Sequence, residues 1–226
     1  MWKLPRNVLL ALALLMSGGA GALAEAMPSA VGKISYGETP VHGAAICSGV
    51  LVAPDLVLTA GHCVRDLTDD PAVIRFEAGW VGGNAAGERR GMTVILTGTA
   101  TAAGLAGLPD DVALVVLESP FLSTEATPLF LTPASGAAFT LYAFRRASPD
   151  QPAKPVTCGQ SVALPGLLGL DCPAVSGNSG APLLQQGGDG WRIVAIMVAA
   201  SGTGPVRSWA VLPPAALLGH IPSMRD

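Results

Sequence analysis

The sequence predicts an all-β protein, because short apolar runs alternate along the chain with clusters of Gly, Pro, Asp and Asn. Runs of about five to eight residues between such turn residues are typical of an antiparallel β-sandwich or β-barrel. The 28 glycines and 19 prolines among 226 residues are too many for a mainly helical chain. Half of the residues are hydrophobic, so a chain of this length can bury a sizeable core.

The expected elements follow one another with few helices among them. Pro54–Asp55 is the expected turn between the first two strands. One helical turn is expected at residues 59–64, and a short C-terminal helix with proline at its start at residues 213–221. Residues 121–136, rich in Pro, Ser and Thr, form the expected connector between two halves. The expected strands cover residues 45–54, 55–61, 72–80, 91–100, 112–119, 139–146, 154–162, 166–173, 181–186, 191–200 and 207–213.

Residues 1–24 have the pattern of a secretory signal peptide. Lys3 and Arg6 precede an apolar run, Val8–Met16, and a small-x-small site follows at Ala22–Ala24. An uncleaved membrane anchor is the alternative, but a membrane span needs about 20 apolar residues and this run is shorter. We therefore expect cleavage, with no membrane association afterwards and an exported protein in the periplasm or outside the cell.

All four cysteines follow the signal segment, and an even number in an exported chain predicts two disulfides. Four cysteines allow three connectivities. The spacing favours the local pairs Cys47–Cys63 and Cys158–Cys172, each closing a loop of about 15 residues. A zinc site is the alternative, although the chain has neither C-x-x-C nor H-x-x-x-H.

Composition and motifs exclude several classes of protein. The net charge is -3, and there is no run of Lys and Arg that would bind nucleic acid. No cofactor motif, phosphate-binding loop or cluster of metal ligands is present, so we expect neither cofactor nor metal. Asp66, Asp69 and Asp70 offer a calcium site as an alternative, but such residues are more often a solvated turn.

Three short stretches contain residues suited to nucleophilic catalysis. His62 lies in LTAGHCV, Asp111 opens the apolar run of LPDDVALVVLESP, and Ser179 lies between Asn178 and Gly180 in VSGNSGAPLL. Each has an ordinary reading alone: a packed histidine, a polar turn and a glycine-rich hairpin. Together they supply a nucleophile, a base and a group that fixes the tautomer of the base. Glycines beside the serine also allow backbone N–H groups to converge on an anion.

With these boxes in this order, the chain resembles the trypsin/chymotrypsin-type serine proteases. LTAGHCV resembles the T-A-A-H-C box of that family, DDVALVVL its D-x-A-L-L strand, and GNSGAP its G-D-S-G-G-P box. Cys47 and Cys63 stand where the family has the disulfide beside the histidine. The resemblance covers roughly residues 30–215. The chain resembles exported bacterial members of this family more than the digestive ones.

The resemblance implies two six-stranded antiparallel β-barrels, residues 28–122 and 123–226, that form one peptidase domain with the active site between them. His62 would be the general base, Asp111 its orienting partner and Ser179 the nucleophile. Asp110 is the less suitable aspartate, because the family's aspartate directly precedes the apolar run. The backbone N–H groups of Gly177 and Ser179 would form the oxyanion hole.

The same resemblance suggests roles for the other two histidines and for the residues of the specificity pocket. His42 and His220 match no box, so we interpret them as structural or surface residues. The specificity pocket would be lined by Pro173, Val198, Ala199 and Ala200. These side chains carry no charge, so we predict cleavage after small or medium apolar residues.

The sequence departs from the family at the residue before the serine. Trypsin has an aspartate there, which pairs with the new N-terminal amine after zymogen cleavage, whereas this chain has Asn178. Lys33 and Ile34, in GKISYG, superficially resemble an activation site. Only 12 residues separate Ile34 from Cys47, a short reach for a tail that must fold back to the second barrel. We therefore expect no trypsin-like switch, with Asn178 holding the loop through neutral hydrogen bonds.

Two other functions compete with an active endopeptidase that acts as a monomer on protein or peptide substrates. One is a catalytically silent, protease-like binding or regulatory module, which usually lacks triad residues. The other is a serine esterase of the α/β-hydrolase fold, which requires the chain order Ser, Asp, His and alternating strands and helices. Neither requirement of the esterase is met here.

Overall fold

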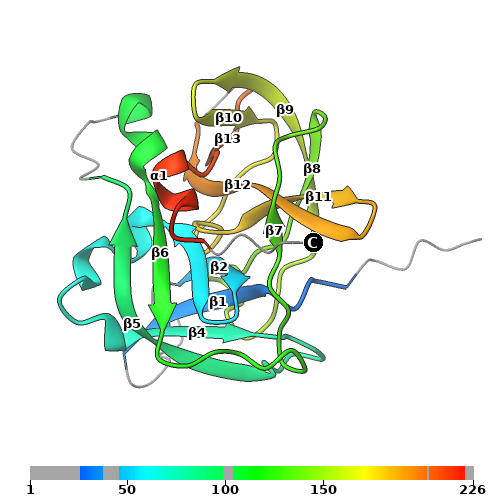
Figure 1. Cartoon of the computed structure of the whole chain (residues 1–226). Helices are drawn as coiled ribbons and strands as arrows, with labels where there is room; N and C mark the ends of the chain where they lie inside the picture. Colours follow the sequence, from blue (N-terminus) through cyan, green and yellow to red (C-terminus); the bar gives the residue numbers. More distant parts are fainter. Residues whose placement is uncertain (1–25, 38–45, 99–103, 203, 222–226) are drawn as a thin grey trace, which may run out of the picture.

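The computed structural model describes residues 26–37, 46–98, 104–202 and 204–221. These residues form two closed β-barrels and one short α-helix, α1 (Ala215–Leu218), as the sequence predicts (Figure 1). The expected signal segment and His42 lie outside the described residues. Within the described parts, no helix combines the length and apolar character needed to cross a membrane.

The first barrel closes in the order β1-β2-β3-β6-β5-β4, with antiparallel neighbours throughout. Its hairpin between β2 and β3 turns at Pro54–Asp55, as expected from the sequence. Every residue of these two strands is buried, which explains why they form a nearly continuous apolar run. The strands are β1 (Val31–Tyr36), β2 (Cys47–Ala53), β3 (Leu56–Ala60), β4 (Ile74–Ala78), β5 (Gly87–Leu96) and β6 (Val112–Leu117).

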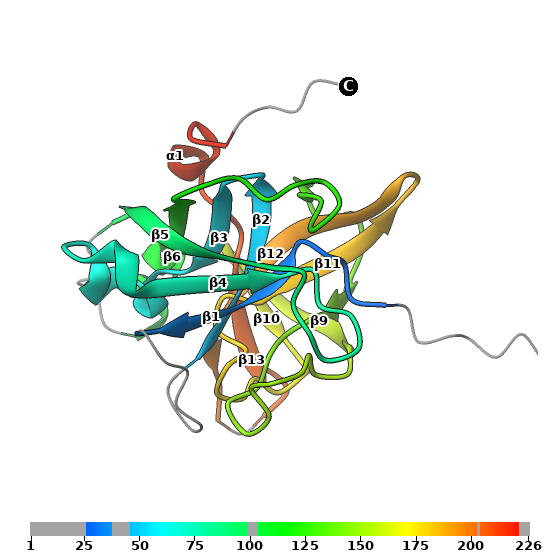
Figure 2. The same ribbon diagram turned by 90° about the horizontal axis from the view of Figure 1, so that it is seen from below.

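The second barrel also closes with six antiparallel strands, because β11 pairs with β12 as well as with β8. The short strand β7 (Phe130–Leu131), within the expected connector, adds to β12 in parallel. Figure 2 shows the two barrels side by side, with α1 at the periphery. The six strands are β8 (Ala138–Leu141), β9 (Val156–Leu164), β10 (Leu167–Leu170), β11 (Pro182–Gly187), β12 (Gly190–Ala200) and β13 (Ser208–Val211).

Among the described residues, helical structure is limited to short segments between strands and to one turn after the last strand. The expected turn near residues 59–64 is the 3₁₀ helix η1 (Gly61–Cys63). Pro214 caps α1, which makes a single turn and buries Leu217. The other 3₁₀ helices are η2 (Arg65–Leu67), η3 (Pro71–Val73) and η4 (Gly104–Asp110).

Strand β1 is not among the strands that the hydrophobic pattern predicts, because it carries a lysine at its centre. Lys33 is 5% exposed, and its Nζ lies 2.9 Å from Glu77 Oε2 and 5.0 Å from the ring centre of Trp80. The strand register places Lys33 directly opposite Glu77 of β4. This pairing makes a buried ammonium group tolerable inside a strand.

Candidate active site

His62 lies on η1, immediately after β3. Its neighbour Cys63 forms a disulfide with Cys47 at the start of β2, which confirms the expected pairing. A Cβ at Gly61 would lie 3.1 Å from Asp111 Oδ1, so glycine lets the two segments approach closely. The disulfide and the tight turn together fix the backbone that carries the imidazole.

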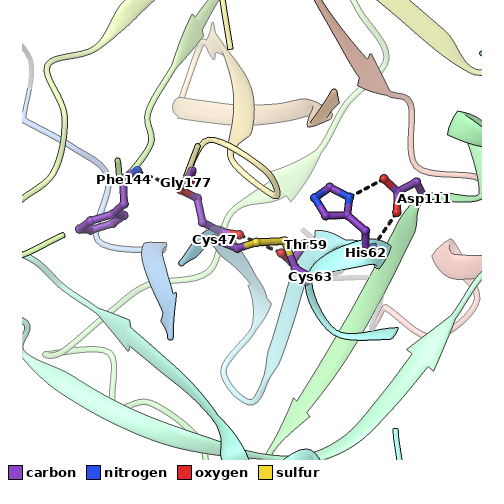
Figure 3. Close-up of a disulfide and its surroundings, with 8 residues drawn as sticks. Cys47, Thr59, His62, Cys63, Asp111, Phe144 and Gly177 are labelled. Carbon is purple, nitrogen blue, oxygen red and sulfur yellow. Dashed lines mark hydrogen bonds and ion pairs between the residues drawn. A yellow bond between two sulfur atoms is a disulfide. The ribbon is translucent and has the colours of Figure 1, made fainter. Parts of the chain in front are cut away.

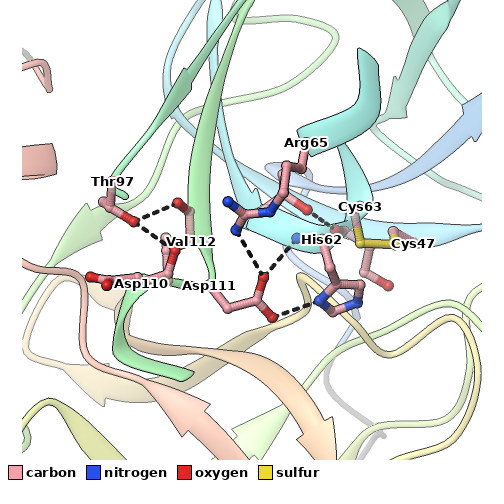
Figure 4. A network of polar contacts seen from close by, with 10 residues as sticks. Cys47, His62, Cys63, Arg65, Thr97, Asp110, Asp111 and Val112 are labelled. Atoms are coloured by element: carbon pink, nitrogen blue, oxygen red, sulfur yellow. Dashed lines mark hydrogen bonds and ion pairs between the residues drawn. A yellow bond between two sulfur atoms is a disulfide. The ribbon is translucent and has the colours of Figure 1, made fainter. Parts of the chain in front are cut away.

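Asp111 reaches His62 because β3 and β6 are paired. Ala60 is opposite Val112, so Asp111 stands directly beside Gly61 and accepts its backbone N–H through the main-chain oxygen at 2.9 Å. The carboxylate accepts two further hydrogen bonds, from the His62 backbone N–H to Oδ1 at 2.7 Å and from Nδ1 to Oδ2 at 2.6 Å (Figure 4).

The hydrogen bond to Asp111 decides the tautomer of the imidazole. A carboxylate only accepts hydrogen bonds, so Nδ1 of His62 carries the proton and Nε2 is left as the acceptor. The side chain of Asp111 is 11% exposed and that of His62 is 45% exposed. A buried acid therefore orients an imidazole whose other nitrogen belongs to a partly exposed side chain.

Asp110 has a different environment. It is exposed, and its main-chain oxygen accepts the hydroxyl of Thr97 at 2.9 Å. The structure thus brings Asp111, and not Asp110, to the imidazole (Figure 4).

Arg65 is a further charged group at the site that the motif analysis does not include. Its Nη1 donates to the carbonyl oxygen of Gly98 at 3.0 Å, and its Nη2 lies 3.8 Å from Asp111 Oδ1. Nη2 is buried and has no hydrogen-bond partner among the described residues. The signal in the sequence was its position three residues after His62, on the adjoining helical turn.

Ser179 lies on a glycine-rich loop, residues 176–180, that precedes β11. We call this segment the nucleophile loop. Gly177 has φ +100° and Gly180 φ +81°, a backbone conformation that favours glycine. Ser179 is half-buried, and its main-chain oxygen accepts the N–H of Ser48 at 2.8 Å.

The first barrel holds this loop close to His62. A Cβ on Gly180 would collide with the Ser48 carbonyl oxygen and the Thr59 hydroxyl, which shows how closely the loop approaches β2 and β3. Ser48 follows Cys47, whose disulfide leads to the residue next to His62. In Figure 3, His62 and Asp111 lie on one side of this disulfide and Gly177 and Phe144 on the other.

The two expected oxyanion donors lie on the nucleophile loop. Within the part of the chain that the structure describes, neither the N–H of Gly177 nor that of Ser179 donates a hydrogen bond to the protein. The N–H groups of Asn178 and Gly180 are used, by Val175 O and Met197 O at 2.9 and 2.8 Å. Two alternate N–H groups of the loop are therefore available for an anionic oxygen.

A hollow of about 490 Å³ opens beside Ser179. Of the four residues expected in the specificity pocket, Ala199 and Ala200 line it, whereas Pro173 and Val198 do not. Val198 is 5% exposed and packs in the core, and Pro173 is exposed. A register shift between Met197 and Ala199 lets consecutive residues of β12 face the hollow. The lining consists of Ala174, Val175, Ser176, Ser179, Met197, Ala199 and Ala200, none of them charged.

Other candidate residues do not join this site. His220 is exposed after α1. Asp66, Asp69 and Asp70 are exposed, and their oxygens form no group with metal-ligand spacing among the described residues. The side chains that do gather in that way are Cys47, His62 and Cys63, whose two sulfurs are joined to each other. The second expected disulfide, Cys158–Cys172, is also present.

A model of the family described as Trypsin matches residues 18–161, well over half of the chain. The matched segment contains His62 and Asp111 and ends before Ser179. Among curated proteins, none matches this chain.

Solved structures share the fold at low sequence identity. A Glu endopeptidase in complex with MPD has a TM-score of 0.67 and 18% identity, covering 88% of this chain and 91% of its own. A thermostable serine protease from an extremophilic microorganism has a TM-score of 0.61 and 20% identity, covering 85% and 95%. An inactivated protease paralogue of the scabies mite has a TM-score of 0.62 and 11% identity, covering 85% and 90%. The fold is thus similar both to proteases and to an inactivated paralogue.

Proposed function

Because the chain belongs to the trypsin family, we propose that it is an exported serine endopeptidase that hydrolyses peptide bonds through an acyl-enzyme. Membership of this family and the two-barrel fold support the enzyme class of serine endopeptidase. The observation that carries the proposal is the buried Asp111 carboxylate, which holds Nδ1 of His62 at 2.6 Å beside the nucleophile loop.

The proposed reaction begins with attack of Ser179 Oγ on the carbonyl carbon of the substrate. His62 Nε2 accepts the hydroxyl proton, and Asp111 stabilises the imidazolium that forms. The N–H groups of Gly177 and Ser179 donate to the oxygen that becomes negative, an interaction that typically contributes about 3 kcal/mol per donor. His62 then gives its proton to the leaving amine. A water molecule, activated by the same base, releases the acyl group from Ser179.

The hollow beside Ser179 supports a preference for uncharged side chains before the scissile bond. Its lining is made of small residues that are apolar apart from Ser176 and Ser179, with Met197 as the longest side chain. No charged group lies among the described lining residues to pair with Lys, Arg, Asp or Glu. We therefore propose cleavage after small or medium apolar residues, a preference distinct from that named for the Glu endopeptidase of similar fold.

The proposed mature protein is a monomer in the periplasm or outside the cell, acting on protein or peptide substrates. Two disulfides are consistent with an oxidising compartment. The proposed processing removes residues 1–24, and residues 28–122 and 123–226 then form the two halves of one peptidase domain.

The competing function is a catalytically silent, protease-like binding or regulatory module. It must be considered because an inactivated protease paralogue has a similar fold. Here the histidine, the aspartate and the serine are all present, and His62 is oriented by Asp111. That arrangement favours the enzyme over the silent module.

A fluorophosphonate probe distinguishes the two functions. The purified mature protein is labelled and its intact mass is measured, with Ser179→Ala as the test variant. Ser161→Ala is the matched control, because Ser161 is an exposed serine of β9 whose hydroxyl donates to Pro205 O at 2.8 Å and which does not line the hollow beside Ser179. We expect one adduct, lost in Ser179→Ala and retained in Ser161→Ala. A folded, processed protein that forms no adduct would instead support the silent module.

A further inference from the structure

Ser48, at the start of β2, is buried and uses every polar group it has. Its hydroxyl donates to the carbonyl oxygen of Gly177 at 2.8 Å and accepts the N–H of Phe144 at 2.9 Å. Its backbone N–H donates to Ser179 O, and its own carbonyl oxygen accepts the Thr59 hydroxyl, each at 2.8 Å. One fully buried serine of the first barrel therefore contacts the nucleophile loop on both sides of Asn178.

Asn178 completes the same arrangement from within the loop. Its Nδ2 donates to the Phe144 carbonyl oxygen at 3.0 Å, and its Oδ1 accepts the Val175 N–H at 3.0 Å. Asn178 is 3% exposed, and both partners of its side chain are neutral backbone groups. A carboxylate here would place an oxygen against the Phe144 carbonyl oxygen, so the environment matches an amide and not an acid.

Phe144 joins these contacts to the wall of the first barrel. Its ring is buried and lies 5.1 Å from that of Trp80, which in turn lies against the Lys33 ammonium group. The backbone of Phe144 is thus held from both of its polar groups, by Ser48 and by Asn178. In the uncut chain, the loop that carries Ser179 is therefore held in place by hydrogen bonds to Ser48 and Phe144.

Cleavage between Lys33 and Ile34 cannot supply a free amine that would support the nucleophile loop instead. Both residues lie in the middle of β1, which pairs with β2 on one side and β4 on the other. Lys33 is buried in its pair with Glu77, and Ile34 is fully buried. Releasing an amine at Ile34 would require opening the barrel.

We infer that Ser48 and Asn178 hold the nucleophile loop in its catalytic form in the uncut chain, through neutral hydrogen bonds, so that no cleavage after Lys33 is needed. This inference rests on the proposed endopeptidase function. Ser48 is a positioning residue: it fixes the carbonyl of Gly177, and through it the direction of the oxyanion donors, without touching substrate.

Kinetics of Ser48→Ala test the inference. The variant leaves Gly177 O and Phe144 N–H without their shared partner, so the donors lose alignment in the transition state. We expect kcat to fall about 100-fold with KM nearly unchanged, because a small misplacement of catalytic groups has an effect of that order. The affinity for a peptide aldehyde, whose hemiacetal oxygen occupies the oxyanion position, should fall in parallel.

Ser208→Ala is the control for a purely structural effect. Ser208 is fully buried, and its hydroxyl donates to Cys172 O at 2.7 Å and not to a residue of the nucleophile loop. Its thermal stability should fall as in Ser48→Ala, while kcat stays within about twofold of wild type. If Ser48→Ala fails to fold, Asn178→Asp keeps the side-chain size and should lower kcat with KM retained.

The outcomes separate this inference from the function on which it rests. Labelling of the wild-type chain with Lys33–Ile34 intact, together with the selective loss of kcat, supports both. Labelling that appears only after cleavage at Lys33, or a Ser48→Ala variant with kcat within about threefold of wild type, overturns the inference and leaves the function. A wild-type protein that labels neither before nor after cleavage overturns the endopeptidase function itself.

Discussion

Replacing Asp111 by asparagine changes the hydrogen bonds of His62 while keeping the size of the side chain. Both carboxylate oxygens now accept from the same residue, from the backbone N–H at 2.7 Å and from Nδ1 at 2.6 Å. Asparagine offers one acceptor and one donor group in their place. The backbone N–H of His62 always donates, so the amide oxygen turns toward it and the amide NH₂ group faces Nδ1. The imidazole then carries its proton on Nε2.

An imidazole with its proton on Nε2 cannot take a proton from Ser179, and this determines the expected decrease in kcat. In a triad of this type, loss of the orienting carboxylate with geometry retained lowers kcat by about 10⁴. The decrease corresponds to about 5.4 kcal/mol of transition-state stabilisation. KM should change little, because Asp111 is buried beneath the imidazole and does not line the hollow beside Ser179.

The assay compares kcat of the wild type and Asp111→Asn on a peptide amide with an apolar residue before the scissile bond. The rate of fluorophosphonate labelling should fall in the same direction. Asp110→Asn is the matched control, since it removes one negative charge from the adjacent, exposed residue. We expect that control to retain activity. A loss of less than about tenfold in Asp111→Asn, or an equal loss in Asp110→Asn, would refute the assigned role of Asp111.

Three further predictions concern stability. Gly180→Ala should destabilise the fold by more than about 4 kcal/mol, because the new Cβ would collide with a carbonyl oxygen and a hydroxyl of the first barrel. Thermal unfolding measures this loss of stability. Gly188→Ala is the control and should change the stability little, because no atom lies near the position of its Cβ. Replacing both Cys158 and Cys172 by alanine should lower the free energy of unfolding by about 3 kcal/mol in denaturant titrations, and no change would contradict a closed loop here. The pKa of Glu125 is lowered from 4.5 chiefly by a backbone N–H at 2.8 Å, and then by an arginine at 2.7 Å, so its carboxylate stabilises the fold above about pH 4.5 and loses that effect as the pH falls. Glu125→Gln should therefore lower the urea midpoint near pH 7 and differ little from wild type in acid.

The fold could be predicted largely from local pattern. Strands β2 and β3 appear in the sequence as apolar runs separated by Pro54–Asp55, and the structure has both with that turn. Strand β1 could not be predicted in this way, because Lys33 interrupts its apolar pattern. Its partner Glu77 lies on β4, and only the closed barrel brings the two together. Pairing across the sheet, which a local pattern does not contain, determines that strand.

The candidate site also contains residues that local sequence predicts and residues that only long-range contacts reveal. Short boxes of sequence identify His62, Asp111 and Ser179 as candidates, because their local surroundings are distinctive. Ser48 is found only in the structure, since its contact with Gly177 joins distant parts of the chain. Arg65 has a local signal in its position after His62, but its contact with Asp111 is seen only in the structure. The residues that line the hollow beside Ser179 could be predicted only in part. An alternation of residues along β12 cannot indicate that both Ala199 and Ala200 face the hollow, because a register shift there depends on the pairing with β13.

Two consecutive residues of β2 connect His62, the proposed general base, and Ser179, the proposed nucleophile. Cys47 is bonded to the neighbour of His62, while Ser48 is hydrogen-bonded to the loop of Ser179. Consecutive side chains of a strand point to opposite faces, so a slip of β2 by one residue would disturb both connections. The register of β2 is set partly by β1, in which Ile34 faces Cys47 and Lys33 faces Ser48. A cut between Lys33 and Ile34 would divide two residues that hold this register. We therefore expect cleavage there to lower the activity of the protein, in line with the proposal that the uncut chain is the active form.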